Sequence, residues 1–166
     1  TQMETGMSYA DALAEAQAKG YAEADPTSDV EGYDAAGKVV ILANLLMPES
    51  AAALTMADVD RQGITRLTPE DIAAAITAGE RWKLIAAVEQ TPAGVRASVK
   101  PIRVPVTNPL ASVGGAMNAI TYTTDLLGDV TLIGPGAGRL ATGYAILEDI
   151  ESIVRSPAIH RRNQVL

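Results

Sequence analysis

The chain has 166 residues, of which 48% are apolar, and its formal net charge is −7. This length and composition suit one globular domain spanning residues 1–166 and exclude an intrinsically disordered chain. The acidic balance disfavours nucleic acid as a partner, and the absence of cysteine excludes disulfides, thiolate zinc sites and a cysteine nucleophile.

Three helix starts carry the same capping signature, a hydroxyl residue followed three positions later by an acid. The pairs are Ser8 with Asp11, Ser28 with Glu31, and Thr68 with Asp71. They predict helices over Tyr9 to Lys19, Asp29 to Met47, and Pro69 to Ala78. The residues that follow these helices are typical of helix ends; they are Gly20, Pro48 and Gly79.

Beyond Gly79 the apolar residues recur at every second position, which is typical of strands with one buried face. Two such runs, residues 82–89 and 95–100, flank the turn sequence TPAG. Pro101 and Pro105 are compatible with the second strand only at an edge or a bend. The runs predict a β-hairpin whose core-facing residues are Trp82, Leu84, Ala86 and Val88.

The last third of the chain predicts two more strands and a closing helix. The strands cover Ala119 to Thr123 and Val130 to Ile133, and the helix runs from about Arg139 to Arg155. Its apolar face consists of Leu140, Tyr144, Leu147, Ile150 and Val154. This order of elements predicts an α+β fold, with one mixed, largely antiparallel sheet covered by helices.

An acidic cluster precedes an apolar helical stretch. Lys38 follows Asp34 by four positions, so these two side chains share a face of the predicted helix. As an exposed ion pair they would add only about 0.3–0.5 kcal/mol of stability. The cluster consists of Glu23, Asp25, Asp29, Glu31 and Asp34.

The small residues around this pair favour a second interpretation. Gly32 and Gly37 each cost roughly 1 kcal/mol in a helix relative to alanine, which a surface ion pair does not require. Small residues let another molecule approach the helix closely. Lys38 is then an oriented proton donor or a fixed cation, and the carboxylates suit a substrate that bears an ammonium group.

Other kinds of site fit the sequence less well. The acidic run lacks the spacing of a calcium loop and Lys38 competes with a cation, so no metal site is expected. His160, the single histidine, lies in a polar tail and cannot supply a His-based triad or an HExxH zinc site. The basic residues form two small groups, Arg96/Lys100/Arg103 and Arg155/Arg161/Arg162. Such groups are more typical of a solvated face and a tail than of a phosphate-binding surface.

No apolar run approaches the roughly 20 residues that a membrane helix needs, so no membrane association is expected. A reducing cytoplasm fits a chain without cysteine.

Several segments resemble homoserine dehydrogenases, and they occur in the order found in that family. They are ALAEAQAKGYAEADP (12–26), GYAEADPTSDVEGYDAAGKVVILANLL (20–46), LTPEDI (67–72), NPLASVGGAMNAI (108–120) and GPGAGRLATGYAILEDI (134–150). Together they cover most of the chain, and several independent segments agree. The chain therefore resembles the substrate-binding and dimerisation domain of this family.

The resemblance implies reversible hydride transfer between NAD(P)H and L-aspartate 4-semialdehyde, giving L-homoserine in threonine, methionine and isoleucine biosynthesis. Lys38 stands where the family has its acid/base, which protonates the nascent alkoxide. Asp34 matches the acid that binds substrate and orients that lysine. Glu23 and Asp29 match acids that receive the α-ammonium group of the substrate.

The resemblance places most of the cofactor site outside this chain. Gly20, Glu23 and Gly138 match family positions that approach the nicotinamide cofactor. GPGAG is not a dinucleotide fingerprint, because Arg139 stands where GxGxxG requires glycine.

The Rossmann domain that binds most of the NAD or NADP in this family has no counterpart in the sequence. We therefore expect a fragment of a longer chain that is inactive alone and forms a homodimer through its sheet. A non-catalytic dimerisation or amino-acid-binding module is the alternative interpretation.

Overall fold

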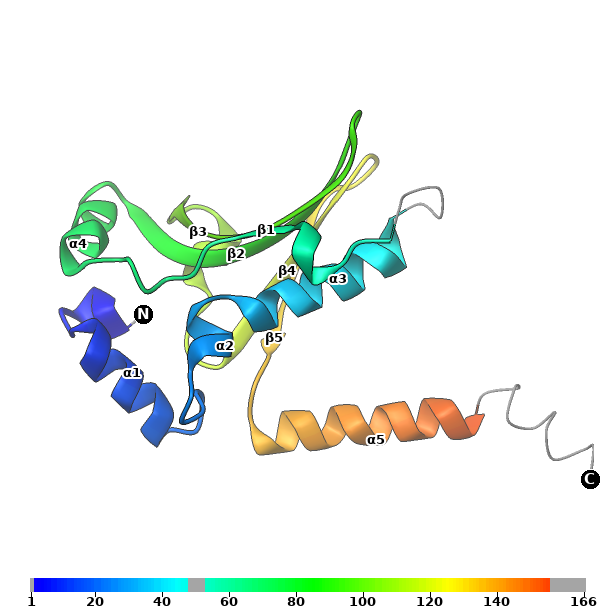
Figure 1. Cartoon of the computed structure of the whole chain (residues 1–166), viewed down its shortest axis with the longest axis horizontal. Coiled ribbons are helices and arrows are strands. Elements are labelled where there is room, and N and C mark those ends of the chain that lie inside the picture. The colour runs from blue at the N-terminus through cyan, green and yellow to red at the C-terminus, as the bar shows by residue number, and fades with distance from the viewer. Residues whose placement is uncertain (1, 48–52, 156–166) are drawn as a thin grey trace, which may run out of the picture. The chain divides into compact units, whose positions relative to one another are not determined.

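The computed structural model describes residues 2–47 and 53–155, which form two compact units (Figure 1). The first unit ends at Ser112 and the second begins at Val113. Pro48, the expected stop of the second helix, and the tail residues His160, Arg161 and Arg162 lie outside the described residues. A single domain over residues 1–166 stays a prediction.

The first unit contains four α-helices and three short 3-10 helices among its described residues. The α-helices are α1 (Tyr9–Ala18), α2 (Thr27–Val30), α3 (Tyr33–Leu46) and α4 (Pro69–Thr77). The 3-10 helices are η1 (Gln2–Thr5), η2 (Met56–Asp58) and η3 (Pro109–Ser112).

The predicted caps of α1 and α4 are confirmed. The Ser8 hydroxyl accepts a hydrogen bond from the backbone N–H of Asp11 at 3.1 Å. Thr68 accepts one from the backbone N–H of Asp71 at 3.2 Å, and the Asp71 carboxylate accepts one from the backbone N–H of Thr68 at 3.0 Å. The second arrangement is a complete capping box, which fixes where α4 begins.

The predicted helix from Asp29 to Met47 is wrong at its start, because the chain interrupts it at Gly32. Gly32 has a φ of 76°, a left-handed conformation that ends α2 and precedes α3. An added Cβ at this position would lie 3.0 Å from Cγ1 of Val99, so packing against the sheet also requires glycine. Ser28 is therefore inside α2, and the backbone N–H of Thr27 is instead accepted by the Asp25 carboxylate at 3.1 Å.

Three strands of the first unit form a mixed sheet in the order β1-β3-β2 (Figure 1). The strands β2 (Glu80–Thr91) and β3 (Gly94–Pro105) form the predicted hairpin around the TPAG turn. The sequence does not predict β1 (Val59–Arg61), which runs parallel to Ala97–Val99 of β3, because three residues are too few to show a strand period. Both prolines of β3 follow the stretch that β1 pairs, as their missing N–H groups require.

The core of the first unit lies between α3 and this sheet. Its buried members are Ala36, Val39, Val59, Ala97 and Val99. Leu84 and Val88 of β2 pack against this cluster as predicted. Ala86 is exposed, contrary to the prediction, on the outer strand of the sheet. Helix α3 is thereby held against the sheet along one face.

The second unit consists of a hairpin followed by a helix. The strands β4 (Met117–Thr124) and β5 (Gly128–Pro135) pair antiparallel, and α5 spans Arg139–Arg155. All three elements are predicted by the sequence, which confirms the α+β class. The described strands form two separate sheets, whereas the sequence predicts one.

The predicted apolar face of α5 is exposed along its whole length. Leu140 is 91% exposed and Leu147 66%, and no described residue of the second unit is buried. In the part of the chain that the structure describes, no helix has the length and apolar character needed to cross a membrane.

Candidate functional site

Helix α3 has a buried face and an exposed face. The buried face consists of Ala36, Val39 and Ala43. The exposed face consists of Asp34, Lys38, Ile41 and Leu45, which follow the spacing i, i+4, i+7, i+11. Lys38 therefore points away from the core, and the surface beside it continues as apolar side chains that are 60% exposed at Ile41 and 73% at Leu45.

Lys38 and Asp34 meet on this face as the spacing predicts. The ammonium nitrogen of Lys38 lies 2.6 Å from Oδ2 of Asp34, and the two side chains are 59% and 52% exposed. A pair this exposed contributes at most about 0.5 kcal/mol of stability. Its effect is geometric, because the carboxylate fixes the direction of the ammonium group.

The two glycines near this pair have different roles. Gly32 is required by its backbone conformation and by Val99, so it is no sign of an approaching ligand. Gly37 lies inside α3 next to Lys38, and an added Cβ there would meet no atom within 4 Å. The surface beside Lys38 is therefore open, as close approach of another molecule requires.

Two members of the acidic cluster are occupied by structural contacts. The Asp25 carboxylate accepts the N–H of Thr27, and hydrogen bonds from the side chain and backbone of Thr27 hold its pKa below the ordinary value. The Glu31 carboxylate accepts a hydrogen bond from the hydroxyl of Thr65 at 2.8 Å. Asp25 thus stabilises the start of α2, and Glu31 stabilises its end.

Glu23 and Asp29, which the sequence predicts to bind substrate together with Asp34, are both exposed. Glu23 lies in the loop between α1 and α2, where its backbone carbonyl accepts a hydrogen bond from Nε2 of Gln17 at 2.9 Å. Asp29 lies in α2. Over residues 2–47 and 53–155, the ion-pair partner of Lys38 is Asp34, and neither Glu23 nor Asp29 forms an ion pair. Both carboxylates therefore remain open to a cationic group.

The glycines assigned to the cofactor lie in different units. Gly20 follows α1 with a φ of 71°, and its N–H donates to the carbonyl of Gln17 at 3.0 Å. Gly138 precedes α5 in the second unit with a φ of 121°. An added Cβ would meet no atom within 4 Å at either position, so the backbone is open at both.

One contact in this region has no signal in the sequence. The guanidinium carbon of Arg61 lies 3.6 Å from the ring centroid of Tyr33, the first residue of α3. Arg61 also donates a hydrogen bond from Nη1 to the backbone carbonyl of Glu31. Arg61 and Tyr33 are 28 positions apart in the sequence, and no local pattern links residues that far from each other.

Metal ligation finds no support in the described residues. Within residues 2–47 and 53–155, no three His, Cys, Asp or Glu side chains lie where they could hold a metal ion.

Comparison with known proteins gives one family. The profile of the homoserine dehydrogenase family matches residues 1–150. The NAD(+)-dependent homoserine dehydrogenase of Pseudomonas canavaninivorans is 50% identical over 157 residues, which cover 94% of this chain and 44% of that protein. The homoserine dehydrogenase of Mycobacterium bovis is 43% identical over 95% of this chain and 36% of that protein.

Solved structures give the same result. Homoserine dehydrogenase of S. aureus at pH 6.5 superposes with a TM-score of 0.82 and 39% identity, covering 92% of this chain and 38% of that one. A hyperthermophilic archaeal homoserine dehydrogenase in complex with NADPH gives a TM-score of 0.71 and 31% identity, covering 94% and 43%. The chain spans less than half the length of the relatives that it matches.

Proposed function

Because this chain belongs to the homoserine dehydrogenase family, we propose that it carries the substrate-binding and proton-transfer part of that enzyme. The reaction is the interconversion of L-aspartate 4-semialdehyde and L-homoserine, on the route to threonine, methionine and isoleucine. The observation that carries the proposal is the Lys38–Asp34 pair on the exposed face of α3, with two open carboxylates in the same unit.

Lys38 is the acid/base. In the reducing direction its ammonium group gives a proton to the oxygen of the nascent alkoxide, and in reverse its neutral amine accepts the hydroxyl proton of L-homoserine. Asp34 accepts a hydrogen bond from Nζ at 2.6 Å and orients it toward substrate. Glu23 and Asp29 bind the α-ammonium group of the substrate by charge.

NAD(P)H, when bound, supplies the hydride. Gly20, Glu23 and Gly138 are the residues of this chain that we assign to it, and the backbone at each of the two glycines is open to close approach. We expect most of the NAD or NADP to be held by a domain outside these 166 residues. One relative is named for NAD(+) and another was solved with NADPH, so either cofactor suits this family.

The proposal is tested by measuring kcat for aspartate semialdehyde reduction in the full-length natural protein that contains these 166 residues. Lys38→Ala lowers kcat by roughly 10²–10⁴-fold, the usual contribution of a positioned general acid. A kcat within threefold of the wild type contradicts the proposal.

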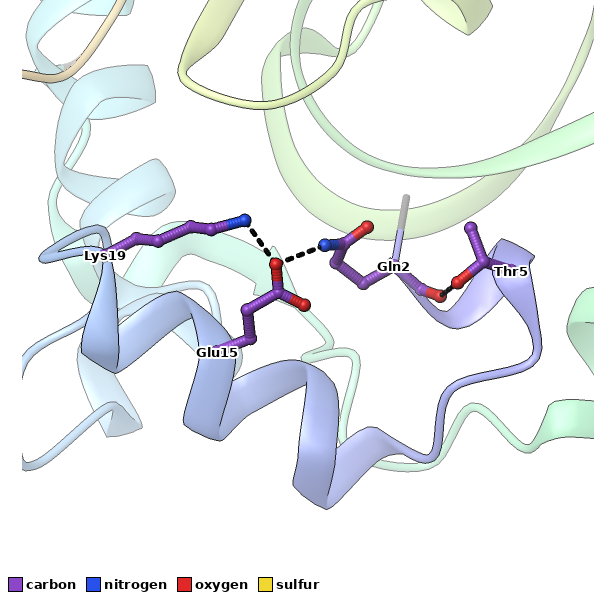
Figure 2. Close-up of polar contacts among 4 residues, drawn as sticks. All are labelled: Gln2, Thr5, Glu15 and Lys19. Carbon is purple, nitrogen blue, oxygen red and sulfur yellow. Dashed lines mark hydrogen bonds and ion pairs between the residues drawn. The ribbon is translucent and has the colours of Figure 1, made fainter.

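Lys19→Ala is the matched control. Lys19 forms an ion pair with Glu15 on α1 at the same i, i+4 spacing, and its side chain is 52% exposed. Figure 2 shows the Glu15 carboxylate between Lys19 and Gln2, and Nε2 of Gln2 donates to it at 2.7 Å. This variant removes an equivalent surface pair, so its kcat stays at the wild-type value.

Residues 1–166 alone are inactive under the proposal, because the hydride donor lacks most of its binding site. NADPH-dependent reduction of aspartate semialdehyde by this chain alone would overturn that part.

We also propose a homodimer formed through the sheets, in the cytoplasm. Exposed apolar side chains on the strands, 43% at Ile102 and 59% at Leu132, support this association. Sedimentation that finds only monomer at micromolar concentration contradicts it.

A further inference from the structure

The residues assigned to substrate binding and to proton transfer stand on two helices that meet at a sharp bend. Asp29 is in α2, whereas Asp34 and Lys38 are in α3, and the junction between the helices is residues 30–33. The distance between the ammonium-binding carboxylate and the proton donor therefore depends on the geometry of this junction. Gly32 in its left-handed conformation makes the bend possible but does not fix it.

A segment from elsewhere in the chain lies across this junction. Residues 61–65, here called the strap, begin at the last residue of β1. The N–H of Gln62 donates to the carbonyl of Val99 at 2.8 Å, which ties the strap to the central strand. The N–H of Ile64 donates to the carbonyl of Val30 at 2.8 Å, and the hydroxyl of Thr65 donates to the Glu31 carboxylate at 2.8 Å. The strap thus links the last turn of α2 to the sheet.

The crossing is too tight for a side chain at its centre. Gly63 is buried, and an added Cβ would lie 2.6 Å from the carbonyl oxygen of Val30 and 2.7 Å from Cα of Glu31. Both are backbone atoms, so the junction itself would have to move. The two segments are therefore in direct backbone contact.

Arg61 contacts both sides of the bend. Its guanidinium donates to the Glu31 carbonyl, at the end of α2, and stacks 3.6 Å from the Tyr33 ring, at the start of α3. Its Cγ also lies 3.7 Å from the position of a Cβ on Gly32, between those two residues. A cation on an aromatic face adds attraction to a hydrogen bond that already fixes the guanidinium plane.

We infer that Arg61 is a positioning residue, which fixes Asp29 relative to Asp34 and Lys38 by holding the α2–α3 junction through the Glu31 carbonyl and the Tyr33 ring. Its kinetic consequence rests on the proposed function. Loss of Arg61 lets the two helices move relative to each other, so a substrate that must contact Asp29 and Asp34 together is bound more weakly.

The experiment uses the longest natural polypeptide with Arg61→Met, which keeps the aliphatic stem and removes the charge and the donors. We expect KM for L-homoserine to rise about tenfold while KM for the nicotinamide cofactor stays within twofold. If Arg61 only stabilised the fold, its loss would lower the fraction of active enzyme and hence kcat, and neither KM value would change selectively. An unchanged KM for homoserine, or an equal rise in both KM values, overturns the inference.

Two further variants test the contact between the cation and the Tyr33 ring. Arg61→Lys keeps a cation over Tyr33, so its KM for homoserine should return most of the way to the wild-type value. Tyr33→Leu removes the ring at a position that is 45% exposed and raises KM for homoserine in the same selective way, which keeps the test available should Arg61→Met fail to fold. A wild-type KM in Tyr33→Leu, or an Arg61→Lys variant no better than Arg61→Met, counts against the inference.

Lys100→Met is the matched control, because Lys100 is a cation on the neighbouring strand β3 whose ion-pair partner is Asp60 and not a junction residue. Hydrogen exchange of residues 30–34 separates the two proposals. Faster exchange in Arg61→Met but not in Lys100→Met supports the role of Arg61 in holding the junction, independently of enzyme activity. Unchanged exchange in Arg61→Met overturns that role. A wild-type protein that does not turn over homoserine contradicts the proposed function but leaves the role of Arg61 at the junction unaffected.

Discussion

The two units of the chain differ in where their apolar side chains lie. In the described residues, every buried apolar side chain belongs to the first unit, where α3 packs on the three-stranded sheet. The second unit keeps its hairpin and helix with no buried residue, and Leu140 and Leu126 are about nine-tenths exposed. The first unit therefore fixes its own geometry, whereas the second shows surfaces typical of contact with other chains or domains.

This difference matters for the site. Glu23, Asp29, Asp34 and Lys38 all belong to the unit that has a core, and α3 is anchored to that core through Ala36 and Val39. A rigid helix holds its exposed face in a constant position, as a proton donor requires.

The largest expected contrast is in amide hydrogen exchange of the chain. Amides of β3 at residues 97–99 lie in the centre of the sheet beside the core, so they exchange only on unfolding of the unit. Amides of α5 open locally, and their protection is lower by several orders of magnitude. Equal protection in β3 and α5, measured by mass spectrometry or NMR, would remove the distinction between the units.

Gly32→Ala tests the bend at the start of α3. A left-handed alanine costs about 1–2 kcal/mol, and the contact with Cγ1 of Val99 adds to that cost. Chemical denaturation should therefore show a loss of about 2 kcal/mol or more in the free energy of unfolding. Gly37→Ala is the control, since its Cβ meets no atom and alanine favours the helix by about 1 kcal/mol. A loss in both variants would contradict the account.

Val99→Ala and Leu132→Ala compare the two units directly. Val99 is fully buried, and removal of its methyl groups should cost about 1–3 kcal/mol of unfolding free energy. Leu132 is 59% exposed on β5, so its truncation should change stability by no more than about 0.5 kcal/mol. The reverse order of the two losses would show that the second unit has a core of its own.

Asp58→Asn should have the smallest effect, and one that depends on pH. The Asp58 carboxylate accepts hydrogen bonds from Thr55 Oγ1 at 2.6 Å and Thr55 N at 2.8 Å, which lower its pKa below the ordinary value of 3.8. A lowered pKa in the folded state gives stability that is present above pH 3.8 and is lost as pH falls through the folded pKa. The difference in Tm between wild type and variant should therefore be visible at pH 7 and shrink toward pH 3. A difference that grows on acidification would have the wrong sign.

Local signals in the sequence are sufficient for most of the elements but not for their assembly. The caps at Ser8 and Thr68 and the bounds of α5 follow from short patterns that act within one or two turns. The break at Gly32 is not predicted, because its cause is Val99, which is far along the chain. Strand β1 is missed for the same reason, since its three residues are extended only by pairing with β3.

The candidate site shows the same division. The spacing of Asp34 and Lys38 predicts their ion pair, because four residues is one helical turn. No spacing predicts that Glu31 is used by Thr65, or that Arg61 stacks on Tyr33. Those contacts depend on where the strap crosses the junction, which is a property of the fold.

The most direct test of the central claim is the kcat of Lys38→Arg in the longest natural polypeptide. Arginine keeps the positive charge but stays protonated, so it cannot exchange a proton with substrate at neutral pH. If Lys38 transfers the proton, kcat falls by about 10²-fold or more, nearly as far as in Lys38→Ala. A kcat for Lys38→Arg within a few-fold of the wild type would show that Lys38 is only a fixed cation and would contradict the account.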